Sequence, residues 1–276
     1  MLGAIGSIQF GAAVAATLFE RLGPAGTVFL RLAFGSVILL VVWRPRPREH
    51  GRRDLLLAAV FGLVLASMNL SFYEALHRVP LGIAVALEVV GPLAVAVAGS
   101  RHALDLLWVG LAVAGILALT NPGATHSLDG LGVALALLAG GFWGVYILLN
   151  ARLGRRFSGG EGLALAMCVA TLAVLPSGLV AGRGSLLTGE ALALGAAIGL
   201  LSTAIPYSFE VEALRRIAPH VFGVLMSLEP CVAALAGLLV LGQHLVPREL
   251  VGIALVVVAS VGASRGGLGK DAPVAV

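Results

Sequence analysis

Long apolar stretches alternate with short polar ones along almost the whole chain. A window of about 19 residues picks out ten apolar segments, at 2–19, 25–43, 55–75, 81–99, 104–120, 131–150, 162–181, 191–213, 219–241 and 250–264. Most approach the ~20 residues that a helix needs to cross the hydrocarbon core of a bilayer. Because the polar breaks are short, consecutive helices are expected to run antiparallel. The pattern predicts an all-α integral membrane protein with ten transmembrane helices.

Composition supports the same fold class. Hydrophobic residues make up 59% of the 276 residues and charged residues only 12%, whereas about 25% is usual in soluble domains. The mean hydropathy is +1.03. Ten spans leave no length for a soluble catalytic or nucleic-acid-binding domain, so we expect contact with membrane lipid and no nucleic-acid partner.

The basic residues are distributed unevenly between alternate loops. Of the 18 Lys and Arg residues, thirteen follow the even-numbered predicted helices, four follow the odd-numbered ones, and Arg31 falls within a helix. Cytoplasmic loops carry the excess of positive charge in membrane proteins. We therefore predict that both termini are cytoplasmic, with residues 265–276 as a cytoplasmic tail.

Two short motifs occur in both halves of the chain. Glu-Ala-Leu at 74–76 reappears at 212–214, a shift of 138 positions, and Leu-Glu followed by Pro occurs at 87–92 and again at 228–230. Each half then holds five helices, and an odd number inverts the second half in the membrane. Inverted repeats are the architecture of many secondary transporters. The expected units are residues 1–120 and 131–264.

Three charged side chains fall inside predicted helices: Arg31, Glu88 and Glu229. A charge in the hydrocarbon region costs about 2.5–3.5 kcal/mol on insertion scales, so such groups are expected to face the bundle interior. They are candidates for a substrate site and for proton coupling. A purely structural interhelical pair is the alternative for each.

Prolines accompany these charges, and less costly polar residues surround them. Pro92 and Pro230 follow the two glutamates, and Pro206 lies in the eighth helix; each removes a backbone donor and is expected to break its helix. Polar and aromatic side chains on shared helix faces could line a cavity, with ordinary interhelical hydrogen bonding as the alternative. These are Gln9, Asn69, Tyr73, Trp143, Tyr146, Thr203, Tyr207 and Glu210.

Signals for enzymatic chemistry are missing from the sequence. The six histidines lie in loops or at helix ends, without a second ligand at metal spacing, and Lys270 is the only lysine. Cys168 and Cys231 lie within apolar runs, where buried thiols are expected rather than a disulfide. We expect no metal, no cofactor and no enzyme activity.

Several segments resemble a known family: SIQ at 7–9, MN at 68–69, VPLGIAVALE at 79–88, GPLAVA at 91–96, STAIPYS at 202–208 and LMSLEP at 225–230. They are similar to the EamA family of the drug/metabolite transporter superfamily, and the resemblance extends from residue 7 to about 264. The chain has Gly242-Gln243 where family members commonly have Gly-Glu. The resemblance implies ten helices in two inverted five-helix repeats.

The resemblance also implies a function. It suggests a secondary transporter of the bacterial inner membrane that exports small neutral amino acids, threonine- or homoserine-like, by proton antiport. Its partners would be the amino acid and protons, and a homodimer is left open. Efflux of other small metabolites or drugs is the alternative, although the first helix has no carboxyl before Glu20. A non-transporting membrane scaffold is a further alternative.

Overall fold

The computed structural model describes residues 2–98, 104–120, 128–182, 184–206 and 227–266, and every regular element in these ranges is helical. The first half contains α1 (Leu2–Ala16), α2 (Phe19–Trp43), the 3₁₀ turn η1 (Pro47–Glu49), α3 (Arg52–Leu76), α4 (Leu81–Glu88), α5 (Val90–Ala98) and α6 (Leu104–Thr120). The second half contains α7 (Gly130–Leu153), α8 (Glu161–Gly182), the 3₁₀ turn η2 (Ser185–Leu187), α9 (Gly189–Gly199), the π-helical turn η3 (Leu200–Ala204), α12 (Glu229–Leu241) and α13 (Pro247–Gly266).

Each of the ten predicted apolar segments overlaps at least one of these helices, so the predicted fold class is confirmed. Among the residues that the structure describes, four helices, α2, α3, α7 and α8, are long and apolar enough to cross a membrane. Their outward faces carry large apolar side chains such as Val41 on α2, Leu56 on α3 and Leu172 on α8, each more than 60% exposed. An apolar exterior of this kind suits lipid tails rather than water.

The boundary between the first two helices differs from the sequence prediction. α1 ends at Ala16, before the predicted end at residue 19, and α2 already begins at Phe19. The expected break instead appears inside α2, where Gly23 has a φ of +65° ahead of Pro24. Glycine tolerates this left-handed conformation at little cost, so the polar segment at 20–24 forms a bent first turn rather than a loop.

Two predicted spans are interrupted within the bundle. The segment at 81–99 is divided into α4 and α5 at Val89, and the segment at 191–213 changes from α-helical to π-helical geometry at Leu200. Pro92 lies four residues after Glu88 and Pro206 four residues after Ser202. Because proline has no N–H group, neither carbonyl receives its helical hydrogen bond from that position.

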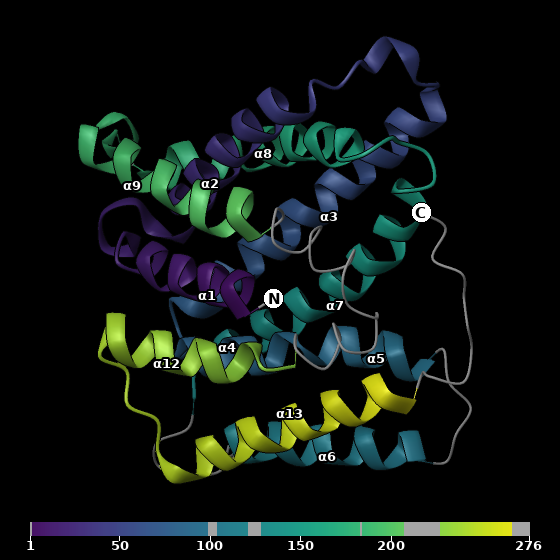
Figure 1. The fold of residues 1–276 in the computed structure, drawn as a ribbon. Coiled ribbons are helices and arrows are strands. Elements are labelled where there is room, and N and C mark those ends of the chain that lie inside the picture. Colours follow the sequence, from purple (N-terminus) through teal and green to yellow (C-terminus); the bar gives the residue numbers. More distant parts are fainter. Residues whose placement is uncertain (1, 99–103, 121–127, 183, 207–226, 267–276) are drawn as a thin grey trace.

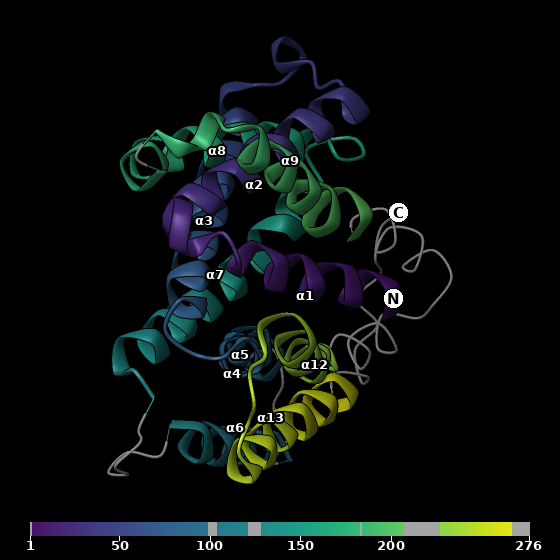
Figure 2. The ribbon, with the colours of Figure 1, turned by 90° about the vertical axis from the view of Figure 1, so that its left-hand side faces the viewer.

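The helices form successive layers, as Figures 1 and 2 show together. α6 and α13 pair along one side of the molecule, and α4, α5 and α12 lie next to them. α2, α8 and α9 form the opposite side. α1, α3 and α7 lie between these groups, with α3 packed along α7 and α1 in contact with both α12 and η3.

Glycines allow several of these helices to touch through their backbones. A Cβ on Gly115 of α6 would lie 2.9 Å from the carbonyl oxygen of Gly252 on α13, and a Cβ on Gly252 would lie 3.0 Å from that of Gly115. Such small-residue contacts are typical of helices packed within a membrane, where close van der Waals packing drives association.

Polar contacts join loops that lie at the same end of the bundle. At the first end, the first turn of α2 pairs with the start of α9 through Arg21 and Glu190, and Arg78 after α3 lies 3.3 Å from Asp129 before α7. At the second end, His50 lies 3.1 Å from Glu161, and Arg156 lies 3.6 Å from Asp54. The loop between α2 and α3 and the loop between α7 and α8 therefore meet.

Candidate functional site

Arg31 is the central charged residue of the candidate site. It lies on α2, and its side chain is half-buried. Its Nη1 donates to the hydroxyl of Tyr73 on α3 at 3.2 Å, and its Cζ lies 5.5 Å from the centroid of the same ring. Its Nη2 donates to the main-chain carbonyl of Ser202 at 3.4 Å. The guanidinium thus joins α2 and α3 to the broken segment of the second half.

The broken segment leaves carbonyl groups without their usual helical partners. In η3 the N–H of Ile205 bonds the carbonyl of Leu200, five residues back, rather than that of Leu201. Pro206 supplies no N–H to either Leu201 or Ser202. These carbonyls bond to side chains from other helices instead, Ser7 Oγ donating to Leu201 O at 2.6 Å and Arg31 to Ser202 O. Single π-helical turns of this kind are frequent at functional sites.

Within the described residues four side-chain polar atoms are buried without a hydrogen-bond partner. Arg248 Nη1 lies at the start of α13, and the other three are Gln9 Oε1, Arg31 Nε and Ser202 Oγ. Gln9 and Ser202 are 3% and 5% exposed. Most buried polar groups in proteins are hydrogen-bonded, so unpaired ones need a physical explanation such as a ligand or water. Two of these atoms, on Arg31 and Ser202, belong to residues that make the contacts around η3.

Small residues allow η3 to approach α1 and α2 closely. A Cβ on Gly11 of α1 would overlap the Oγ of Ser202, and a Cβ on Gly35 of α2 would lie 3.1 Å from the Oγ1 of Thr203. Thr203 is 2% exposed. The predicted site residues Arg31, Tyr73 and Thr203 are therefore brought to one region.

Glu88 ends α4, and Glu229 begins α12. At 1.5 Å per residue, Glu88 lies roughly 10 Å along the helix from the first end of α4, and Glu229 roughly 18 Å from the corresponding end of α12. Both depths fall in the interior of a ~30 Å hydrocarbon core. The Arg31 guanidinium interacts electrostatically with Glu88, although no ion pair among the described residues joins them. Glu229 is 5% exposed.

The two prolines beside these glutamates lie at different places in their helices. Pro92 interrupts a span because it has no N–H to donate to the Glu88 carbonyl. That carbonyl packs closely against α7, since a Cβ on Gly140 would lie only 2.5 Å from its oxygen. Pro230, by contrast, occupies the first turn of α12. Proline is favourable there because its N–H would have no helical partner. Residues 219–226 of the predicted ninth helix lie outside the described residues, so a break of that helix at Pro230 stays a prediction.

Other predicted cavity residues have local partners. Asn69 Nδ2 donates to Leu65 O of its own helix at 2.8 Å. Tyr146 stacks on Phe61 with ring centroids 5.0 Å apart, in the α3–α7 interface, and Trp143 also packs against the core. These contacts match the alternative of ordinary helix packing. Tyr207 and Glu210 lie outside the described residues.

Two residues that take part in the contacts around η3 were not predicted from the sequence as site residues: Ser7 and Ser202. Ser202 contributes through a main-chain oxygen that no residue type identifies, and Ser7 through a bond to another main-chain oxygen. Pro206 was the available signal, because it frees the carbonyls of the preceding turn.

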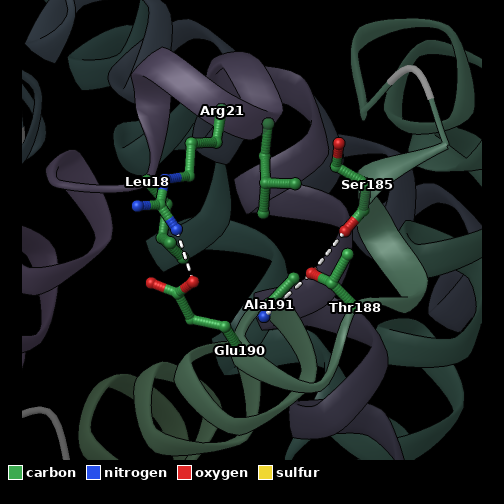
Figure 3. A pocket seen from close by; sticks show the side chains of 7 residues that line it. Leu18, Arg21, Ser185, Thr188, Glu190 and Ala191 are labelled. Carbon is green, nitrogen blue, oxygen red and sulfur yellow. Dashed lines mark hydrogen bonds and ion pairs between the residues drawn. The ribbon is translucent and has the colours of Figure 1, made fainter.

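The first end of the bundle carries a separate pocket of about 340 Å³, shown in Figure 3. Arg21 and Glu190 face one another across one side of it, and Ser185 and Thr188 lie on another. Thr188 caps α9 by accepting from the N–H of Ala191 at 3.3 Å. Arg21 and Glu190 are 64% and 60% exposed, so this pocket is a surface feature distinct from the buried contacts around Arg31.

The described residues contain no group of three or more His, Cys, Asp or Glu side chains placed to hold a metal ion. What the structure does assemble is a helical bundle with an apolar exterior and a charged group bonded inside it. This combination defines a polytopic membrane protein with an interior polar site.

Comparisons with known proteins identify the family. The model of the EamA-like transporter family matches residues 130–265. The chain is 41% identical over 265 residues to the threonine/homoserine exporter RhtA of Escherichia coli strain K12 and, equally, to that of Salmonella typhimurium strain LT2, covering 96% of this chain and 90% of each relative. The chain belongs to the EamA-like transporter family. Its function is therefore transport of a small molecule rather than enzymatic catalysis.

The fold also has a counterpart among solved structures. One protein crystal structure matches with a TM-score of 0.64, covers 95% of both chains and is 17% identical in sequence. At this identity the match concerns the fold alone. The two folds are therefore similar over nearly the whole length of the chain.

Proposed function

We propose that this protein exports small neutral amino acids of the threonine and homoserine class across the bacterial inner membrane. The observation that carries the substrate class is the 41% identity, over nearly the full length, to exporters named for threonine and homoserine. The structure adds a charged and hydroxyl-bearing site inside the bundle, which is the chemistry that a hydrophilic solute requires.

The contacts around Arg31 support a site for an amino-acid zwitterion. An arginine stays charged in proteins and offers five N–H donors. Nη1 and Nη2 each donate one hydrogen bond here, and Nε is buried without a partner. A substrate carboxylate would satisfy that donor and pair with the guanidinium. The hydroxyl of Tyr73 lies 3.2 Å from Nη1 and offers a hydrogen-bonding group to a hydroxy amino acid.

We further propose proton antiport through the two buried glutamates. Glu88 and Glu229 lie at helix breaks within the bundle, where a carboxyl group that binds a proton loses the charge that is costly in the hydrocarbon region. If substrate binding and protonation compete at one of them, a proton entering the cell accompanies each amino acid leaving it. Competition at one site is the simplest way to couple opposite fluxes.

The second end of the bundle is proposed to face the cytoplasm. Eight arginines lie in or beside the two loops that meet there: Arg44, Arg46, Arg48, Arg52, Arg53, Arg152, Arg155 and Arg156. At the first end the described arginines are Arg21, Arg78 and Arg248. This excess supports a cytoplasmic second end under the positive-inside rule, and the pocket of Figure 3 would then face the periplasm.

Residues 1–120 and 131–264 are proposed to be inverted repeats. A twofold axis in the membrane plane would pair α2 with α8, α6 with α13, and α4 with α12, and each of these pairs is packed together. Under the same axis, the packing of α1 against α12 is equivalent to the packing of α7 against α4 and α5. Both contacts occur. Such a relation gives both sides of the membrane equivalent access to a central site.

Efflux from proteoliposomes tests the proposal. Vesicles containing the purified protein are loaded with single radiolabelled amino acids, and release is followed with and without an imposed proton gradient. We expect rapid release of threonine and homoserine, accelerated by protons outside and slowed by an ionophore that collapses the gradient. Release no faster than from protein-free vesicles for every amino acid would refute the substrate class, and gradient-independent release would refute antiport.

A further inference from the structure

We propose that the main-chain carbonyl of Ser202, freed at the break before Pro206, binds the α-ammonium group of the substrate while Arg31 beside it binds the α-carboxylate. The inference rests on the proposed function as an amino-acid exporter and assigns the ammonium subsite to the protein backbone.

The first argument is that the α-helical donor for this acceptor is missing. Proline at position 206 has no N–H for the Ser202 carbonyl, and the π-helical turn shifts the bond of Ile205 back to Leu200. A buried carbonyl needs a donor from elsewhere. Inside a membrane protein, main chain that departs from the α-helical pattern is tolerated where it is buried in protein or lines a cavity, and in transporters carbonyls freed at helix breaks coordinate cations.

The second argument is that a cationic donor already occupies the acceptor. Arg31 Nη2 donates to Ser202 O at 3.4 Å, which is beyond the usual 2.7–3.2 Å for an N–H···O bond. The carbonyl oxygen has two lone pairs and can accept a second, shorter bond. A primary ammonium is a compact charge with three donors. It can therefore approach the Ser202 oxygen more closely than a guanidinium that is already held by Tyr73.

The third argument is that a group suited to an anion and a group suited to a cation lie next to each other. The Arg31 guanidinium and the Ser202 oxygen are neighbours, so an anion-binding and a cation-binding group lie side by side, as an α-amino acid requires. The unpaired Nε of Arg31 and Oγ of Ser202 belong to the same two residues. The adjoining carbonyl of Leu201 is already held by Ser7 at 2.6 Å, which fixes the segment against α1.

The test compares a proline substitution that restores an N–H at the site with one that restores an N–H elsewhere. Pro206→Ala gives position 206 a donor for the Ser202 or Leu201 carbonyl. Pro176→Ala makes the same change within α8, where Pro176 is exposed. Binding of threonine and of 3-hydroxybutyrate, which lacks the ammonium group, is measured by calorimetry on the full-length protein.

We expect Pro206→Ala to raise the Kd of threonine about tenfold, as for loss of one hydrogen bond to a charged group. The Kd of 3-hydroxybutyrate should stay unchanged, so the preference for threonine shrinks by the same factor, and Pro176→Ala should alter neither. Equal weakening of both ligands would overturn the ammonium assignment and leave Pro206 with a structural role. Wild-type protein that neither binds nor transports threonine would instead refute the proposed function.

A second measurement needs no change to the proline. Threonine labelled at its nitrogen is bound to protein labelled at the serine carbonyl carbons, and dipolar recoupling by solid-state NMR measures the distance between the labels. A hydrogen bond predicts a nitrogen-to-carbonyl-carbon separation of about 4 Å or less. The signal must disappear in Ser202→Ala, which keeps the carbonyl but removes its label. Absence of recoupling in the wild-type protein with bound threonine would contradict the inference.

Discussion

The guanidinium of Arg31 on α2 is held by the hydroxyl of Tyr73 on α3, 3.2 Å from Nη1, with the ring of the same tyrosine 5.5 Å from Cζ. Tyr73 is fully buried and packs against Phe19 and Phe72. One aromatic residue therefore fixes both the position and the direction of the charge at the centre of the candidate site.

The first prediction concerns this hydroxyl. Tyr73→Phe keeps the ring packing and removes one hydrogen bond to a charged group, so we expect the Kd of threonine to rise roughly tenfold. Binding calorimetry on purified protein measures the effect, with thermal unfolding as the check that the fold is intact. An unchanged Kd would show that the Arg31–Tyr73 hydrogen bond does not position the guanidinium for substrate binding.

The second prediction concerns proton coupling. Glu229→Gln keeps the size of the side chain but cannot exchange a proton, so proton-driven efflux should be abolished in proteoliposomes while the protein still folds. Glu88→Gln should also lose acceleration by the gradient. Glu20→Gln, at the exposed first turn of α2, is the matched control and should transport normally. If Glu229→Gln still responds to the gradient like the wild type, Glu229 has no part in coupling.

The third prediction concerns the crossing of α4 and α5 with α7. A Cβ at Gly140 would lie 2.5 Å from the carbonyl oxygen of Glu88, whereas a Cβ at the adjacent Gly141 would meet nothing within 4 Å. Overpacking of this kind costs about 1–3 kcal/mol. Gly140→Ala should therefore lower the Tm in a thermal unfolding assay and impair transport, because the main chain beside Glu88 must shift.

Gly141→Ala is the control for that change. It alters the same helix by one methyl group and should leave the Tm unchanged or slightly higher, since alanine favours helix over glycine. Equal Tm values for the two variants would contradict the close backbone contact.

The fourth prediction concerns acid sensitivity at the first end of the bundle. Asp129 precedes α7, and its carboxylate accepts from the N–H groups of Gly132 and Leu131 at 3.3 and 2.8 Å. These bonds hold the pKa of Asp129 below its ordinary value of 3.8, with Arg78 as a weaker contributor. Since the folded pKa is lowered, the carboxylate contributes stability above pH 3.8, and that contribution is lost as the pH falls through the folded value.

Unfolding curves of the wild type and of Asp129→Asn, measured between neutral pH and pH 3, test this linkage. The Tm advantage of the wild type should be constant above pH 5 and should shrink below pH 3.8, because asparagine does not titrate in this range. Parallel Tm profiles for the two proteins across that window would contradict the assignment.

The helices were predictable because the membrane leaves the backbone few options. Within hydrocarbon every N–H and C=O must be bonded internally, so an apolar run of about 20 residues is almost always a helix. The breaks were harder to locate. Pro92 signals an interruption, but the helix divides at Val89, three residues earlier, since the carbonyl that loses its partner lies one turn before the proline.

Site residues whose charge is costly inside the membrane could be predicted from the sequence. Groups that act through the main chain could not. Arg31 is conspicuous in an apolar run because a guanidinium there must find partners, and the structure shows them on Tyr73 and Ser202. Asn69 gave the same polar signal but bonds its own helix. The oxygen of Ser202 carries no such signal, because it depends on a π-helical turn that the residue types alone do not specify.

Initial rates of threonine efflux from proteoliposomes, compared between Arg31→Gln and Glu190→Gln, test the central claim most directly. Arg31→Gln removes the charge within the bundle, whereas Glu190→Gln breaks the exposed pair at the pocket of the first end, and exposed pairs contribute little. With substrate bound at Arg31, efflux falls by more than tenfold in the first variant and stays near the wild-type rate in the second. Normal efflux in Arg31→Gln would contradict a substrate site at Arg31.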